Sequence, residues 1–263
     1  MPGGRLFAAD RPGRGGRVSS TYLVVSQARL DLRIVLRNGE QLLLTLLIPL
    51  ALLIALTLSD FVSLDVPTGV SRVDAALAAV LTVAVLSGAF TSLALSIGFD
   101  RRSGALLLLA TTPLSRTGIL VARSLSTLIV VLLQAAVLVA AAALLGWRPS
   151  VAAFGTLGVV VLGSFSLGAL GFALGGAVRA EASLALANGI FLVLLFAGGV
   201  VVPASALPAW LGAVVQWLPS AALGDALRSL LAAAPGAMGL DLGLLIAWAA
   251  LGVLITARTF KWD

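Results

Sequence analysis

Six stretches of this 263-residue chain are each long and apolar enough to cross a lipid bilayer. A membrane-spanning helix needs about 20 apolar residues to cross a hydrocarbon core of about 30 Å. Lipid must therefore be the solvent for most of the chain. We expect an all-α, polytopic membrane protein with six transmembrane helices, at 42–58, 75–99, 117–145, 151–178, 183–202 and 240–257.

The composition agrees with a lipid environment and excludes several kinds of chemistry. Hydrophobic residues make up 60% of the chain and charged residues 11%, too few to coat a soluble domain of this length. Cysteine and histidine are both absent, which excludes disulfides, thiol nucleophiles and imidazole ligands or bases. The net charge of +6 is not gathered on a polar face with interleaved aromatic residues, so no nucleic-acid partner is expected.

The first 40 residues divide into two parts, ahead of a six-helix domain at 41–263. Residues 1–17 are rich in glycine, proline and arginine and predict a disordered cytoplasmic tail with no cleaved signal peptide. Residues 18–40 predict an amphipathic helix on the membrane surface, because Arg29, Arg33 and Arg37 fall four apart on one helical face. A cytosolic extension of the first span is the alternative.

The basic residues predict the orientation. With the N-terminus inside, all but three of the seventeen basic residues face the cytoplasm, the exceptions being Arg72, Arg148 and Arg228. This distribution obeys the positive-inside rule and predicts that both termini are cytoplasmic. Every basic residue except Lys261 is arginine. We interpret that bias as the mark of a GC-rich bacterial genome, so the expected location is a bacterial plasma membrane.

The first cytoplasmic loop combines charge with a short apolar helix. Charged residues at 100–102 precede about two apolar helical turns, far too few to cross the membrane. Ser103 is the expected N-cap, and Pro113 should end the helix because the residue before a proline avoids the helical conformation. The leucines of this helix have to be buried, either against another protein or against the base of their own bundle.

The outer connection between the fifth and sixth spans is about 36 residues long and is interrupted by prolines at 203, 208, 219 and 235. Two apolar helical pieces, 209–217 and 221–234, are too short to cross and predict an extracellular re-entrant or interfacial hairpin. Trp210 and Trp217 suit the headgroup level. Asp225 and Arg228 are spaced to pair with each other.

Few polar side chains lie deep inside the spans. Gln134 and Asn188 are the amides near mid-membrane, and each either bonds helix to helix or lines a pathway. Arg123 lies near the cytoplasmic edge and can extend its guanidinium toward the headgroups. In the fourth span, Gly171 and Gly175 make a small-residue step that lets a neighbouring backbone come close. No mid-membrane acid is present, which argues against ion-coupled secondary transport.

The loop between the second and third spans carries the most specific likeness to a known family. Residues 99–106 (FDRRSGAL) and 109–116 (LATTPLSR) resemble the signature E-x-G-T-L-x-x-L-x-x-T-P-x-S-R of ABC-2 type transporter permeases, notably the daunorubicin-resistance-like exporters. Residues 36–40 (LRNGE), before the leucine-rich span with Pro49, are similar to the family's R-N-P-x entry. Residues 207–228 are similar to its L-P-x-W-L…P…A-L-R segment. The matches keep the family's order.

The resemblance implies the membrane subunit of an exporter powered by a separate ATPase subunit. That partner would use ATP and magnesium, and this chain would bind no cofactor. In the family the loop helix couples to the ATPase, the N-terminal helix lies near that subunit, and the outer hairpin closes the pathway. The implied coupling residues are Asp100, Arg101, Arg102, Leu106, Leu109, Thr112, Pro113 and Arg116. The residues implied for the interfacial helix are Arg29, Arg33, Arg37 and Glu40, and those for the extracellular gate are Pro208, Trp210, Trp217, Pro219, Asp225 and Arg228.

The residues themselves fit this division of labour. The chain has no G-x-x-x-x-G-K-[ST] phosphate loop to bind ATP. Six spans are too few for a two-lobed pathway, so a second copy or a homologous permease subunit is expected. A lining of aliphatic, serine and threonine side chains suits a hydrophobic or amphiphilic cargo such as a drug, polyketide, lipid or glycolipid. The alternatives are an intramembrane lipid-modifying enzyme and a structural membrane subunit without transport.

Overall fold

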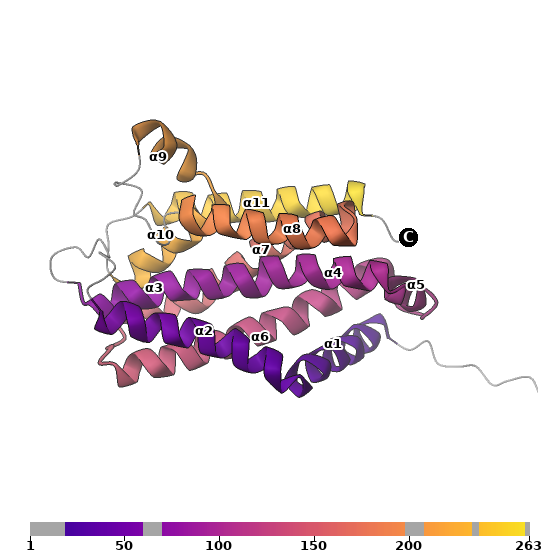
Figure 1. Ribbon diagram of the computed structural model, residues 1–263, viewed down its shortest axis with the longest axis horizontal. Helices are drawn as coiled ribbons and strands as arrows, with labels where there is room; N and C mark the ends of the chain where they lie inside the picture. Colours follow the sequence, from indigo (N-terminus) through magenta and orange to yellow (C-terminus); the bar gives the residue numbers. More distant parts are fainter. Residues whose placement is uncertain (1–18, 60–69, 198–207, 233–236, 261–263) are drawn as a thin grey trace, which may run out of the picture.

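The computed structural model describes residues 19–59, 70–197, 208–232 and 237–260, and all regular structure in these ranges is helical (Figure 1). The proposed tail at 1–17 and parts of the outer connection lie outside them. The helices are α1 (Ser20–Arg37), α2 (Gly39–Leu58), α3 (Arg72–Val85), the π-helix η1 (Leu86–Thr91), α4 (Ser92–Arg102), α5 (Ala105–Ala110), α6 (Arg116–Leu144), the 3₁₀ helix η2 (Val151–Phe154), α7 (Gly155–Ala177), α8 (Ala180–Ala197), α9 (Ala209–Val215), α10 (Pro219–Leu231) and α11 (Met238–Thr259).

Each predicted span coincides with a helix over nearly all of the residues that the structure describes. In the described residues, four continuous helices are long and apolar enough to cross a membrane: Arg72–Arg102, Arg116–Leu144, Val151–Ala177 and Met238–Thr259. The first of these joins α3, η1 and α4. Two shorter apolar helices, Thr45–Leu58 and Glu181–Phe196, coincide with the first and fifth predicted spans. The expectation of an all-α, multi-pass membrane protein is confirmed.

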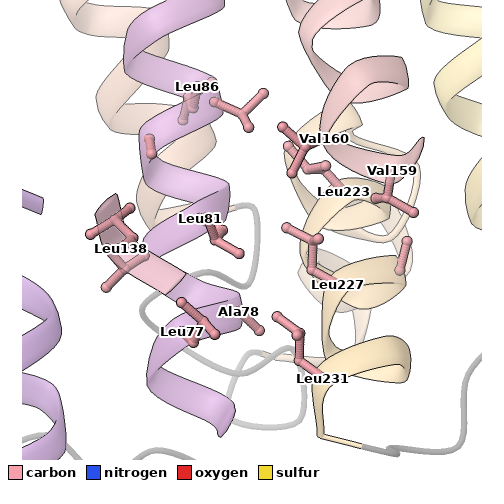
Figure 2. Packing of buried hydrophobic residues seen from close by; sticks show 14 of the residues in the cluster. Leu77, Ala78, Leu81, Leu86, Leu138, Val159, Val160, Leu223, Leu227 and Leu231 are labelled. Carbon is pink, nitrogen blue, oxygen red and sulfur yellow. The ribbon is translucent and has the colours of Figure 1, made fainter. Parts of the chain in front are cut away.

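The hydrophobic core lies between α3, α7 and α10. Figure 2 shows Leu77 and Leu81 of α3 facing Leu223 and Leu227 of α10, and all four side chains are fully buried. Most of α10 is buried, because it packs into the end of the bundle against α3, α7 and α11. The second piece of the predicted hairpin is therefore a core element, whereas α9 stands clear of the bundle in Figure 1.

Glycines of α7 allow the closest helix contacts. A Cβ added at Gly171 would lie 2.6 Å from the carbonyl oxygen of Phe90, and one added at Gly175 would lie 2.5 Å from that of Ala94. Distances this short exclude any side chain at either position. The predicted small-residue step on the fourth span is confirmed, and it serves packing of α7 against the second span inside the bundle.

Candidate functional site

The loop between α4 and α6 holds a short helix, as predicted, but with a different start. Gly104 precedes α5 with a φ of +72°, a left-handed conformation that glycine adopts without strain. Ser103 instead follows the end of α4, so its expected role as N-cap of the loop helix is wrong. The hydroxyls of Thr111 and Thr112 donate to the carbonyls of Leu108 and Leu109 and end the helix three residues before the proline.

The helix α5 has one buried face and one exposed face. Leu106 is only 1% exposed and packs with Leu93, Ile97 and Phe172 on α4 and α7. Leu109 is partly buried against the same cluster. Leu108 points away from it and is 70% exposed. Leu106 therefore seats the helix on the bundle, and Leu108 is exposed on its outer side.

The charged residues before α5 also divide between inside and outside. Arg101 donates to the carbonyls of Gly176 and Val178, at 3.2 and 2.8 Å, and so caps the end of α7. Arg102 stays exposed and lies 3.6 Å from the carboxylate of Glu181, in the first turn of α8. Thr112, Pro113 and Arg116 are exposed as well. The outward surface of the loop thus includes Arg102, Leu108, Thr112 and Pro113. Arg116, the first residue of α6, lies beside it.

Asp100 belongs to a cluster of charges behind the loop. The guanidinium of Arg123 pairs with the Asp100 carboxylate and donates to the hydroxyl of Ser96 at 2.8 Å. Its Nε lies 3.5 Å from Oδ2 of Asp31 on α1, and Gln27 donates to the other oxygen of Asp31 at 2.9 Å. One arginine on α6 therefore joins α1 to the end of α4 that leads into α5. These side chains are largely buried.

This cluster is not visible in the sequence pattern, which predicts only that Arg123 lies near the membrane edge and extends its guanidinium toward the headgroups. The available signal was Asp31, a single acid on the apolar face of a helix otherwise rich in arginine. Asp31 and Ala28 are the buried residues of α1. A lone acid on such a face indicates a basic partner on the neighbouring helix.

The arginines of α1 lie where the amphipathic pattern predicts. Arg29, Arg33 and Arg37 are exposed, whereas α1 packs its other face along α6. Glu40 belongs to the first turn of α2 rather than to α1, because Asn38 interrupts the helix. The membrane-surface position of α1 stays a prediction.

At the opposite end, the predicted gate residues fall on two different helices. Pro208 precedes α9, and Trp210 and Trp217 are exposed around it. The indole of Trp248 on α11 donates to the Trp217 carbonyl at 2.8 Å. Pro219 is the buried first residue of α10. On that helix Asp225 and Arg228 form the expected ion pair, at 2.5 Å.

The two mid-membrane amides have different surroundings. Gln134 is buried and donates to the carbonyl of Thr45 at 2.8 Å. Thr45 lies four residues before Pro49, which has no N–H to offer that carbonyl. Gln134 thus replaces the hydrogen bond that the proline removes, and the helix-to-helix interpretation is confirmed. Asn188 lies on the exposed side of α8.

Against this geometry, the comparison with protein families is decisive. The family model for the ABC-2 family transporter protein matches residues 48–258. The chain belongs to the ABC-2 transporter family. As a permease component it is the membrane part of an ABC transporter, which works with an ATPase partner and is not itself the ATPase. The matched range holds the α5 loop together with Asp100 and Arg123, whereas Asp31 lies before it. No curated protein matches the chain.

Proposed function

We propose that this ABC-2 permease is the membrane subunit of an exporter for hydrophobic or amphiphilic molecules, and that the outward surface of the α5 loop is its ATPase contact. The observation that carries the proposal is Leu108. This large aliphatic side chain is 70% exposed at the tip of a short loop, among exposed polar residues. Its burial against a partner protein would be favourable. An apolar anchor surrounded by a polar rim is typical of a protein interface.

The α5 loop is attached to its neighbouring helices closely enough to transmit a movement of the ATPase to them. Leu106 anchors α5 to α4 and α7, Arg101 holds the end of α7, and Arg123 joins the end of α4 to α1. A displacement of α5 would therefore move four helices as a unit. When two ATPase subunits close on ATP, such a unit would tilt the bundle and open a route between two permease copies.

Export, cargo and pairing follow from this arrangement as parts of the same proposal. With both termini and α5 on the cytoplasmic side, the ATPase would act from inside, in a bacterial plasma membrane. The second membrane half would be another copy or a homologous permease. The described spans carry mainly aliphatic side chains, which favours a cargo with a large apolar part.

The test of the contact is Leu108→Asp. We expect this variant to insert normally and to lose the ATPase on co-purification, because a buried carboxylate without a partner opposes docking by several kcal/mol. Leu144→Asp is the matched control, since Leu144 is 90% exposed at the other end of α6. Retention of the ATPase by the Leu108 variant, at the level of the control, would contradict the proposal.

The ion pair on α10 tests the gate. We expect the double variant Asp225→Ala with Arg228→Ala to keep the ATPase bound but to change efflux several-fold, because α10 lies at the end of the bundle remote from α5. ATP-dependent uptake into inverted vesicles, which corresponds to efflux from the cell, is compared with the ATPase retained after purification, so the two effects are measured separately. Unchanged efflux in the double variant would remove the role of the pair in the gate.

A further inference from the structure

A groove of about 1050 Å³ runs along the bundle between α6 and α11. Its floor is α7, with Phe165 and Phe172, and its walls include Leu120 and Leu128 of α6 and Val253 of α11. The side chains that line it are mainly aliphatic or aromatic. The groove occupies the half of the bundle that carries α5, since it includes the first residues of α6 and the last of α11.

The groove opens sideways between spanning helices. Val121, Phe165 and Val253 line it and are about half exposed or more. Two of its hydroxyls are already bonded within their own helices: Ser164 donates to the Val160 carbonyl at 2.7 Å and Thr256 to that of Gly252 at 2.8 Å. The lining therefore favours a hydrocarbon chain over a polar molecule.

One end of the groove carries a basic side chain. Arg116 and Thr117 line it there, at the first turn of α6, where the helix N-terminus adds partial positive charge. Ser115 caps this turn by accepting from the N–H of Gly118 at 3.1 Å. An apolar channel that ends at an arginine and a helix N-terminus matches an acyl chain that ends in a phosphate.

We propose that this groove binds an anionic phospholipid of the leaflet nearest α5, with the acyl chain along α7 and the phosphate at Arg116. The lipid would also support α5 from behind. Leu93 and Phe172 line the groove and belong to the cluster that buries Leu106, and Leu120 and Phe260 pack against the same cluster. An occupied groove would keep this cluster covered on its open side.

The test uses the full-length chain, reconstituted in vesicles of phosphatidylcholine and phosphatidylglycerol, extracted in detergent and examined by native mass spectrometry. We expect wild type to retain phosphatidylglycerol in preference to phosphatidylcholine. Arg116→Gln should lower that retention about tenfold, the usual weight of a charge-assisted hydrogen bond. Arg148→Gln, an exposed arginine beyond the other end of α6, should leave it unchanged.

A second pair of variants tests the apolar part. Ala250 lines the groove and Ala247 does not, although both are exposed on α11. Ala250→Trp should lower the retention of both lipids several-fold, and Ala247→Trp should leave the retention of both unchanged. Cross-linking of a phosphatidylglycerol with a photoreactive acyl chain, mapped to 164–172, checks the position in the wild-type protein.

Three outcomes would overturn the proposal. They are equal retention in the Arg116 and Arg148 variants, labelling away from α7, and loss of a second protein copy rather than of lipid in the Ala250 variant. ATPase association plays no part in these measurements, so they stand apart from the test of the α5 contact.

Discussion

Replacing Arg123 with methionine is expected to destabilise the protein more than any other single charge removal in the described bundle. Arg123 lies between the carboxylates of Asp31 and Asp100, and the variant would leave both buried acids without their cation. Breaking a buried ion pair by removing one partner costs about 3–5 kcal/mol of unfolding free energy. Titration with a denaturing detergent, followed by circular dichroism, measures the loss.

The matched variants separate charge from packing. Arg29→Met removes an exposed arginine of α1 and should change stability by less than about 0.5 kcal/mol. The triple variant Asp31→Leu, Asp100→Leu, Arg123→Met removes all three charges and should recover most of the loss, since apolar replacement of a buried ion pair is often neutral. If the single and triple variants were equally unstable, the packing of the arginine chain rather than its charge would be responsible.

A substitution at Gly175 should separate two helices that the fold needs in contact. The added Cβ would lie 2.5 Å from the Ala94 carbonyl oxygen, and backbone cannot move aside as a flexible side chain can. We expect Gly175→Ala to lower the free energy of unfolding by about 3 kcal/mol, the upper part of the range for overpacked cores. Gly175→Leu should prevent assembly, which appears as aggregation on size-exclusion chromatography.

The control for this prediction lies on the same helix. Gly158 has no atom within 4 Å of an added Cβ. Gly158→Ala should therefore leave the protein as stable as wild type, or more stable by up to about 1 kcal/mol through helix propensity. The two alanine variants should differ in sign, and a stable Gly175→Ala protein would mean that α4 and α7 do not approach as closely as described.

The spans could be predicted from the sequence because a bilayer demands long apolar runs, and such runs are visible without knowledge of neighbours. The Gly171 and Gly175 step was visible for the same reason, as a local spacing on one helix. The outer ion pair of Asp225 and Arg228 is local as well, three residues apart on α10. In these cases the information lies within a few helical turns.

Features that depend on several helices could not be predicted. The six residues of α5 are all alanine or leucine, so no polar face shows that Leu106 turns inward and Leu108 outward. The partners of Arg123 come from α1 and α4, and only the packing of three helices brings them together. The π-helix at Leu86–Thr91 packs against α6 and α7, and no periodic pattern in the sequence marks it.

The bond between Gln134 and the Thr45 carbonyl has a consequence for biosynthesis. The two residues are 89 positions apart, and α3 and α4 lie between them in the chain. During synthesis the first span, which carries Thr45, leaves the ribosome well before Gln134 has been synthesised. The Thr45 carbonyl can accept this hydrogen bond only after the third span has arrived. The order in which the spans are released into lipid is therefore part of how this protein matures.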